Sequence, residues 1–350
     1  MTKQIRVGKI KIGGKAPVVI QSMAKTDTRD VSATVRQIKE LEKAGCEIVR
    51  VAIKDFQAAR AIKKIRKRIN IPLVADIHFD YRLAIEAIEN GADKIRLNPG
   101  NIHKEEQIRA VARAAKKRKI PIRVGINSGS LKNASAGNMV KAAIDYIKIL
   151  EKAGFYDIIV SLKASDVLTT IEAYRKFAKS SRYPLHLGIT AAGPVSTGLV
   201  KSSIGIGALL LQGIGDTIRV SLTVHPCEEV VAAKNILQAL NLRNFGPEII
   251  SCPTCGRCQV DLESIVTKLA FSLSAKGETS PATAGGQPSV FSQKPFKIAV
   301  MGCEVNGPGE AKEADIGIAF GKSAGVLFKK GKIVKRVKEK DAIKTLLRNI

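Results

Sequence analysis

The feature that most restricts the fold is an alternation of short apolar runs with amphipathic segments over the first 245 residues. The amphipathic segments, such as VSATVRQIKELEKAG, repeat apolar residues every three or four positions. Several of them stop at a glycine just before the next run, as helices do. The runs themselves are rich in β-branched residues and have the length of buried strands. There are eight: Val18–Met23, Glu47–Ile53, Pro72–His78, Lys94–Asn98, Pro121–Asn127, Asp157–Lys163, Leu185–Thr190 and Thr217–Thr223.

Eight strands that alternate with helices predict an α/β fold of the (β/α)8 type, a TIM barrel, over residues 1–245. A doubly wound open sheet would give the same periodicity, so it stays an alternative at this point. No GxGxxG sequence follows the first strand, which weakens the dinucleotide-binding form of that alternative.

After residue 245 the pattern changes to that of a small α+β domain, residues 246–350. A short strand at Glu248–Ser251 leads into the sequence CPTCGRC, and a helix follows over roughly Asp261–Ser274. The Gly-, Pro- and Ser-rich stretch near 275–295 predicts a flexible loop. Beyond it we expect strands at Lys297–Met301 and Ile316–Phe320, a hairpin turn at Lys330–Gly331 and a last helix from Lys340.

The chain is strongly basic, with 58 Lys and Arg against 31 Asp and Glu and a formal net charge of +27. Such an excess is typical of nucleic-acid binders, but the chain has no Trp and only 4% aromatic residues to stack on bases. No stretch reaches the ~18 consecutive apolar residues of a membrane span. The first residues, MTKQIRVGKIKIGGKAP, lack the apolar core of a secretory signal. We therefore expect a cytoplasmic protein whose charge needs another explanation.

Part of the charge lies where core residues should be. Four predicted strands hold an arginine flanked by apolar residues and a fifth ends in a lysine: Arg50, Arg96, Arg123, Arg219 and Lys163. Burying several unpaired cations is costly. These cations either pair with carboxylates such as Asp76 or Glu47, or they bind a polyanion at the carboxyl-terminal mouth of the barrel. Four arginines at matching positions favour the polyanion.

Other polar residues follow along the same predicted strands. Asn98, Asn127 and Ser221 would add neutral hydrogen-bond donors to such a site. Asp76 and His78, at the end of the third strand, are acid/base candidates from their spacing alone.

Cysteines point to a second kind of site. Cys252, Cys255 and Cys258 lie within seven residues, and Cys303 adds a distant fourth thiol. The C-x2-C-x2-C spacing favours metal ligation in a reducing compartment over a disulfide framework. Zinc and an iron–sulfur cluster both fit it, so these residues leave the metal open. One functional alternative is therefore a basic nucleic-acid-binding protein with a structural zinc site.

Nine motifs resemble those of one family, the bacterial-type IspG (GcpE) family of 4-hydroxy-3-methylbut-2-enyl diphosphate synthases. They occur in order over nearly the whole chain: IQSMAKTDT, ADIHFD, IRLNPGNI, RVGINSGSL, HLGIT, KSSIGIG, GIGDTIRVSLT, CPTCGR and MGCEVNGPGEA. The resemblance implies a TIM barrel followed by a small [4Fe–4S] domain, in a homodimer. It also implies reductive opening of 2-C-methyl-D-erythritol 2,4-cyclodiphosphate with two electrons and loss of water, in the non-mevalonate isoprenoid pathway. An acidic flavodoxin or ferredoxin would supply the electrons.

Position by position, the resemblance assigns roles to residues of this chain. Cys252, Cys255 and Cys303 become thiolate ligands, and Glu310 becomes the fourth ligand. A carboxylate is a harder, more exchangeable iron ligand, so Glu310 would also take part in catalysis by opening an iron site. Asp76 and Asn127 become catalytic residues beside the substrate. The diphosphate-binding residues become Arg50, Arg96, Arg123, Asn127, Lys163, Arg219 and Ser221.

The chain departs from the family pattern at two positions that bear on activity. Ala191 stands where the family's Thr-Glu-Ala-Gly sequence has a glutamate proposed for acid/base work, and an alanine cannot transfer a proton. Either another group substitutes, or this form is slow or inactive. Cys258 is an extra cysteine that, as a fourth thiolate in place of Glu310, would make the cluster a plain electron carrier. The intact NGPGE sequence favours Glu310 as the ligand.

Overall fold

The computed structural model describes residues 1–275, 295–303, 311–322 and 324–350 of the chain. These residues form two compact units, Met1–Arg243 and Asn244–Ile350. The sequence pattern predicted a division after residue 245. The flexible loop predicted near 275–295 falls almost entirely outside the described residues. Within the described ranges, no helix is long and apolar enough to cross a membrane.

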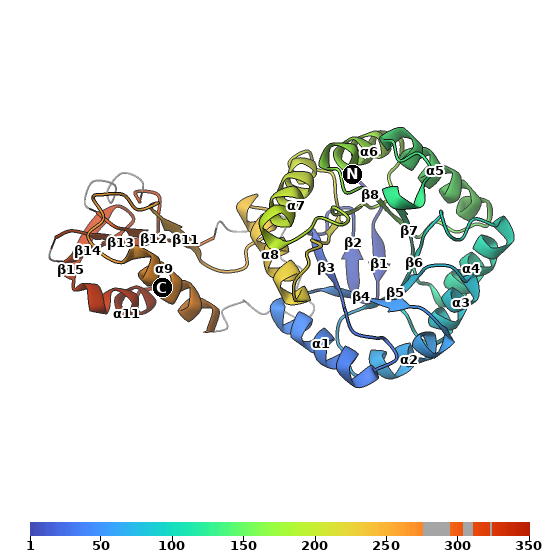
Figure 1. Cartoon of the computed structure of the whole chain (residues 1–350), viewed down its shortest axis with the longest axis horizontal. Coiled ribbons are helices and arrows are strands. Elements are labelled where there is room, and N and C mark those ends of the chain that lie inside the picture. Colours follow the sequence, from blue (N-terminus) through green and yellow to red (C-terminus); the bar gives the residue numbers. More distant parts are fainter. Residues whose placement is uncertain (276–294, 304–310, 323) are drawn as a thin grey trace. The chain divides into compact units, whose positions relative to one another are not determined.

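The first unit is a closed barrel of eight parallel strands, as predicted (Figure 1). Neighbouring strands pair in the order β8-β7-β6-β5-β4-β3-β10-β9, and a parallel bridge between Val160 and Leu185 closes the ring. β9 and β10 are shorter than the predicted runs, and β9 ends where the backbone leaves regular strand geometry at Gly188. The strands are β3 (Val19–Met23), β4 (Ile48–Ile53), β5 (Leu73–Ile77), β6 (Lys94–Leu97), β7 (Ile122–Asn127), β8 (Ile158–Lys163), β9 (His186–Leu187) and β10 (Thr217–Ile218).

Helices surround the barrel, one after each strand (Figure 1). Side-chain caps fix the amino-terminal turns of α1, α2, α3, α5 and α6, as where Asp55 accepts a hydrogen bond from the Ala58 amide at 2.8 Å. The predicted glycine stops are correct, since Gly45, Gly91 and Gly154 all have positive φ angles. The helices are α1 (Val31–Ala44), α2 (Phe56–Arg66), α3 (Tyr81–Glu89), α4 (Glu105–Arg118), α5 (Ala136–Lys152), α6 (Val167–Ser180), α7 (Val195–Leu210) and α8 (Pro226–Ala239), with a 3-10 turn η1 (Ser128–Ser130) before α5.

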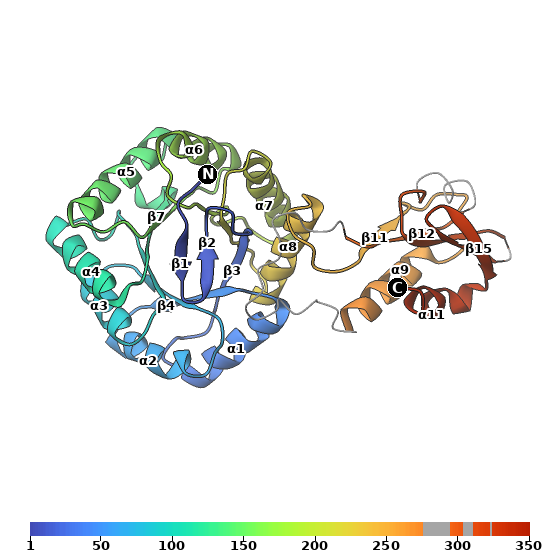
Figure 2. The same cartoon turned by 180° about the vertical axis from the view of Figure 1, so that it is seen from behind.

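A hairpin that the sequence did not predict closes the amino-terminal end of the barrel. Its strands are β1 (Ile5–Val7) and β2 (Ile10–Ile12), which lie across the centre of the ring in both views (Figures 1 and 2). Ile5, Val7 and Ile12 are buried in one apolar cluster with residues from the first halves of β3, β4, β5 and β8. The interior is therefore accessible from the opposite end, where the strands finish.

The second unit is a five-stranded mixed sheet covered by helices, in agreement with the predicted α+β domain. Its strands pair in the order β11-β12-β13-β14-β15; only β14 runs against the others, so β11, β12, β13 and β15 end at the same edge. Leu262, Ile265 and Leu269 of α9 pack on apolar residues of β12 and β13. The elements are β11 (Glu248–Ser251), α9 (Leu262–Ala275), β12 (Lys297–Met301), β13 (Ile316–Phe320), β14 (Gly325–Lys329), β15 (Lys332–Val337), a 3-10 turn η2 (Glu339–Asp341) and α11 (Ala342–Leu347).

Candidate active site

The carboxyl-terminal mouth of the barrel holds a small polar cavity. Its volume is about 40 Å³, because long cationic side chains fill most of the space between the strand ends. All the predicted cations and two of the predicted neutral donors line it. The lining residues are Arg50, Arg96, Arg123, Asn127, Ser161, Lys163, Thr190, Arg219 and Ser221.

Asp76, at the end of β5, is the acidic centre of one side of this mouth. Its carboxylate pairs with Arg96 at 3.1 Å and with Arg50 at 3.6 Å, and the His78 ring lies 3.6 Å from it. Burial favours the neutral acid, but Arg50, the His78 hydrogen bond and Arg96 outweigh it and hold the pKa of Asp76 well below its usual range. The interpretation that strand arginines pair with Asp76 is thus correct for two of them. Glu47 instead pairs with Arg243, at 2.6 Å.

Glu229, on α8, is a second buried carboxylate that the sequence did not reveal. It is 3.4 Å from Arg219 and 3.4 Å from Lys25, and it accepts a hydrogen bond from the Leu222 amide at 3.0 Å. It occupies the first turn of its helix, where carboxylates are common for reasons of the helix dipole alone. Because a glutamate at the start of a helix is common, nothing in the sequence indicated that the Glu229 side chain reaches the barrel interior.

The two carboxylates do not neutralise the cations of the mouth. Among the described residues no carboxylate pairs with Arg123 or Lys163. Arg123 is 1% exposed; its Nη1 is 3.5 Å from the Ser161 hydroxyl, while Nε and Nη2 are buried with no hydrogen-bond partner in the described part of the chain. Burial, followed by the positive charges of Arg123 and Arg219, lowers the pKa of Lys163 well below that of a free lysine. Orphaned buried donors of this kind indicate a site built for an anion.

A second polar layer lies deeper in the barrel and was also missed. Lys94, fully buried at the start of β6, donates to the Gln21 side-chain oxygen at 3.0 Å. His186 of β9 bonds the Thr217 hydroxyl through Nδ1 at 2.7 Å, while its Nε2 has no partner. Burial and the positive charges around them lower the pKa of Lys94 and of His186 well below their usual values. When protonated, Lys94 and His186 would add positive charge beneath the cavity, and no carboxylate among the described residues pairs with them.

Two glycines leave the room that the cations need. A Cβ on Gly125 would lie 2.7 Å from Arg96 Nε, and one on Gly188 would lie 2.6 Å from Lys163 Nζ and overlap the Arg219 carbonyl oxygen. Gly188 also has a φ of +153°, which L side chains rarely adopt. The backbone at β7 and β9 is therefore shaped around the charged side chains.

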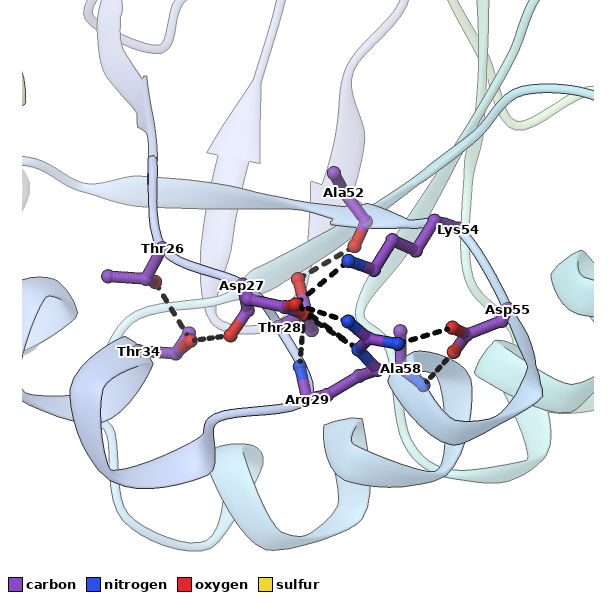
Figure 3. Close-up of polar contacts among 9 residues, drawn as sticks. All are labelled: Thr26, Asp27, Thr28, Arg29, Thr34, Ala52, Lys54, Asp55 and Ala58. Atoms are coloured by element: carbon purple, nitrogen blue, oxygen red, sulfur yellow. Dashed lines mark hydrogen bonds and ion pairs between the residues drawn. The ribbon is translucent and has the colours of Figure 1, made fainter.

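Loops around the mouth are fixed by a separate ion-pair network (Figure 3). Asp27, after β3, accepts from Arg29 at 2.7 Å and from Lys54 at 2.8 Å, and Arg29 also reaches Asp55 at 3.3 Å. Thr28 ties the same loop to β4 by donating to the Ala52 carbonyl at 2.7 Å. These surface cations are already paired, so they hold the rim of the barrel in place and leave anion binding to the interior.

The cysteines gather at one edge of the second sheet. Cys252 follows β11 and Cys303 lies two residues after the neighbouring parallel strand β12. The Gly302 amide donates to Cys252 Sγ at 3.3 Å. Cys258 Sγ donates to the Val260 carbonyl at 3.2 Å and lies where a Cβ on residue 302 would be. Cys255 is exposed in the intervening loop.

Comparison with known proteins decides the family. Residues 2–234 match the GcpE TIM-barrel domain, and residues 248–350 match the GcpE protein C-terminal domain. The chain belongs to the GcpE family. Two curated members, from Caldanaerobacter subterraneus subsp. tengcongensis and Thermodesulfovibrio yellowstonii, are each 54% identical over all of this chain and over 96% and 98% of their own length. Both are 4-hydroxy-3-methylbut-2-en-1-yl diphosphate synthases (flavodoxin).

Solved structures extend the likeness of the GcpE barrel to a more distant fold relative. Dihydropteroate synthases from Yersinia pestis and Stenotrophomonas maltophilia superpose with TM-scores of 0.53 and 0.54 at 13% and 14% identity. They match 69% and 68% of this chain and 99% and 98% of their own. At that identity the match concerns the barrel fold alone.

The GcpE C-terminal domain implies a thiolate-bound cluster, and the donors described here fit one in part. Two of the three predicted thiolates, Cys252 and Cys303, end adjacent parallel strands, and an amide N–H points at one sulfur, as amides do around iron–sulfur clusters. Glu310, the predicted fourth ligand, lies outside the described residues. Within the described ranges no three His, Cys, Asp or Glu side chains are grouped to hold a metal ion. Cys258, the alternative fourth thiolate, is turned to the Val260 carbonyl.

The GcpE barrel thus brings together every predicted substrate-binding side chain, with Asp76 directly behind two of them. Ser161 and Thr190 line the same cavity but were not among the predicted residues. Their positions near strand ends were the available signal. Ala191 follows Thr190 in a left-handed conformation with φ of 49°, at the exposed rim. The roles of these residues toward a ligand stay predictions.

Proposed function

We propose that the chain is a 4-hydroxy-3-methylbut-2-enyl diphosphate synthase of the non-mevalonate isoprenoid pathway. It opens 2-C-methyl-D-erythritol 2,4-cyclodiphosphate reductively, with two electrons and loss of water. The observation that carries the substrate assignment is the buried excess of cations around Arg123 and Lys163, which a diphosphate would neutralise. We further propose that it acts in the cytoplasm as a homodimer, with an acidic flavodoxin or ferredoxin as donor; the curated relatives are named for flavodoxin.

The barrel residues bind and orient the diphosphate. Arg123, with two unpartnered donor atoms, offers a fork to phosphate oxygens, and Arg219 offers its free Nε. Burial and the cationic neighbours of Lys163 lower its pKa, and a bound anion would raise that pKa again because its negative charge opposes theirs. Asn127 and Ser221 donate neutral hydrogen bonds from the rim of the cavity. Together they hold the diphosphate at the carboxyl-terminal mouth of the barrel.

Asp76 acts in this proposal by positioning other groups. Its low pKa keeps the carboxylate ionised, which makes it a poor proton donor in the free protein. Held at 3.1 Å from Arg96 and 3.6 Å from Arg50, it fixes both guanidinium groups before the substrate arrives.

The second unit would hold a [4Fe–4S] cluster through Cys252, Cys255, Cys303 and Glu310. When bound, such a cluster would pass the two electrons of the reaction, one at a time, from the external donor to the substrate. Gly302 contributes an amide hydrogen bond to the Cys252 sulfur and, having no side chain, leaves space for the Cys258 thiol.

The test is an anaerobic preparation of the full chain. We expect a brown protein with a broad visible absorbance, with iron and sulfide by chemical analysis. We expect the cyclodiphosphate at 100 times its Kd to stabilise the fold by about 2.7 kcal/mol. With a chemical reductant, the diphosphate product should form. A colourless zinc protein that binds duplex DNA in a salt-dependent way and ignores the cyclodiphosphate would instead favour the nucleic-acid alternative, which none of the matches supports.

A further inference from the structure

A basic groove in the second unit has no role in the function proposed above. It lies between β15 and α11 and has a volume of about 500 Å³. Six cations and one carboxylate contribute to its lining, which consists of Lys335, Arg336, Val337, Lys338, Lys340, Asp341, Lys344, Thr345 and Arg348. We call this surface the C-terminal groove.

The charge of the C-terminal groove is not neutralised by any carboxylate among the described residues. The six cations are all exposed, and within the described residues none forms an ion pair with a carboxylate. Lys340, Lys344 and Arg348 follow one another at intervals of four, so their side chains share one side of the last helical segment. Like charges this close repel one another, so an acidic partner would be attracted to the groove before contact.

The occupant should be a folded acidic surface. A site for a small phosphate buries its donors, as the barrel does at Arg123, whereas these cations are spread over fourteen residues and remain in water. No aromatic side chain of the described residues lines the groove, so these residues offer no platform for stacked bases. Beside it, Ile333 and Val334 are 77% and 52% exposed on the edge strand β15. Apolar residues next to exposed cations suit a protein interface.

The groove is also close to the cysteine edge of the same sheet. β15 runs parallel to β12, and Arg336 is aligned with Met301 through Val326 and Ala319. Three strand spacings of ~4.8 Å place these two backbone positions about 14 Å apart. Met301 directly precedes Gly302 and Cys303, so a partner in the groove would lie beside the strand end that carries a predicted cluster ligand.

We propose that the C-terminal groove is the docking site of the acidic redox protein that delivers electrons to this enzyme. The inference rests on the proposed function, because it takes the partner to be the electron donor. It assigns to Arg336, Lys340 and Lys344 the role of attracting and orienting that donor, without contact with the substrate.

The experiment compares two variants that lose the same charge. One is Arg336→Gln, Lys340→Gln, Lys344→Gln in the groove; the control is Lys63→Gln, Lys64→Gln, Lys67→Gln on and after α2, where the three lysines are also exposed. Binding of an oxidised acidic bacterial flavodoxin to the full, cluster-loaded chain is measured at low ionic strength. We expect the groove variant to bind about tenfold more weakly and the control variant to bind as the wild type does.

Turnover separates docking from chemistry. With reduced flavodoxin the groove variant should show a KM for flavodoxin raised about tenfold, whereas with a small viologen reductant its rate should equal that of wild type. Equal flavodoxin binding by both variants and wild type would overturn the proposal, and so would equal losses in the two variants. Duplex DNA that binds the wild type more tightly than flavodoxin does at 0.15 M salt, and loses affinity in the groove variant, would also overturn it. A wild type that fails with viologen would count against the proposed function, while the binding comparison would still decide the groove.

Discussion

The two units of this chain carry their positive charge in opposite ways. At the mouth of the barrel the cations are buried or half-buried and converge on one cavity, and they include donors such as Arg123 Nε and Nη2 that have no partner among the described residues. In the second unit the cations of the C-terminal groove are exposed and solvated. Burial makes a cation costly without its ligand and selective for a small, highly charged one. An exposed cation costs little free energy, attracts acidic partners over a distance and is sensitive to salt.

The prediction with the largest expected effect tests whether the barrel transfers protons as well as supplying positive charge. Ala191→Glu would put a carboxylate at the rim beside Thr190, which lines the cavity. The left-handed φ of 49° at this position strains alanine and glutamate alike, so the change should be tolerated. If general acid/base work is missing at this position, kcat in an anaerobic turnover assay should rise ~10²–10⁴-fold.

Ala191→Gln is the matched control, since it has a similar shape without the proton. No gain in the glutamate form, or an equal gain in both, would mean that another group of the chain already transfers the proton.

The second prediction separates binding from stability in the barrel. Arg123→Met should weaken diphosphate binding about 100-fold or more, because one partner of a desolvated charge pair is worth ~2–5 kcal/mol. The same change should leave the Tm unchanged or raise it, since a buried unpaired cation is replaced by an apolar side chain. Calorimetric titration and thermal unfolding measure the two effects.

Arg60→Met, on the exposed face of α2 where Arg60 pairs with Glu86 at 3.1 Å, should change neither quantity strongly. A fall in Tm for Arg123→Met comparable to that of a core deletion would show that Arg123 is held by the fold rather than reserved for a ligand.

The third prediction uses salt to compare the two units directly. Raising ionic strength from about 0.05 M to 0.3 M should lower flavodoxin-dependent kcat/KM about tenfold, because exposed charges are screened over a Debye length. Diphosphate binding in the barrel should change by less than about threefold, because buried pairs are screened far less. Similar salt responses at the two sites would remove the distinction between buried and exposed charge.

The prediction with the smallest expected effect concerns the number of protons that the protein takes up when it binds the diphosphate. The folded-state pKa of Lys163 is lowered by burial and by Arg123 and Arg219, and a bound anion raises it again. At pH values between the lowered pKa of the free protein and the higher pKa of the complex, the complex holds more protons than the free protein, so binding takes up protons and weakens as pH rises. Calorimetry in two buffers of different ionisation enthalpy measures the uptake.

Lys163→Gln should abolish most of this uptake, whereas Lys179→Gln, at an exposed position of α6, should leave it unchanged. Proton release on binding would contradict the assignment of Lys163 as the group that gains charge.

Much of the fold could be read from the sequence, because β-branched runs and glycine stops are local signals. The strand positions are correct: six strands match the predicted bounds to within one residue at each end, and β9 and β10 are much shorter than expected. The β1–β2 hairpin was missed because Ile5, Val7 and Ile12 gain their burial from strands far along the chain. No local pattern in such a short segment records that contact.

The residues of the candidate site were likewise predicted only in part. The strand arginines stood out because a cation within an apolar run is unusual, and the cavity brings them together. Glu229 and His186 did not stand out, since a helix-terminal glutamate and a single histidine have common structural explanations. Their importance depends on which strands meet in the barrel, which is tertiary information.

The hairpin formed by β1 and β2 determines the route by which ligands enter and leave the barrel. With the amino-terminal end of the barrel sealed by Ile5, Val7 and Ile12, nothing can pass through the tube from end to end. A diphosphate product must therefore leave through the opening by which the cyclic substrate entered, past the same arginines. Product and substrate therefore compete for one site, so inhibition by the product should be competitive with the substrate in steady-state kinetics.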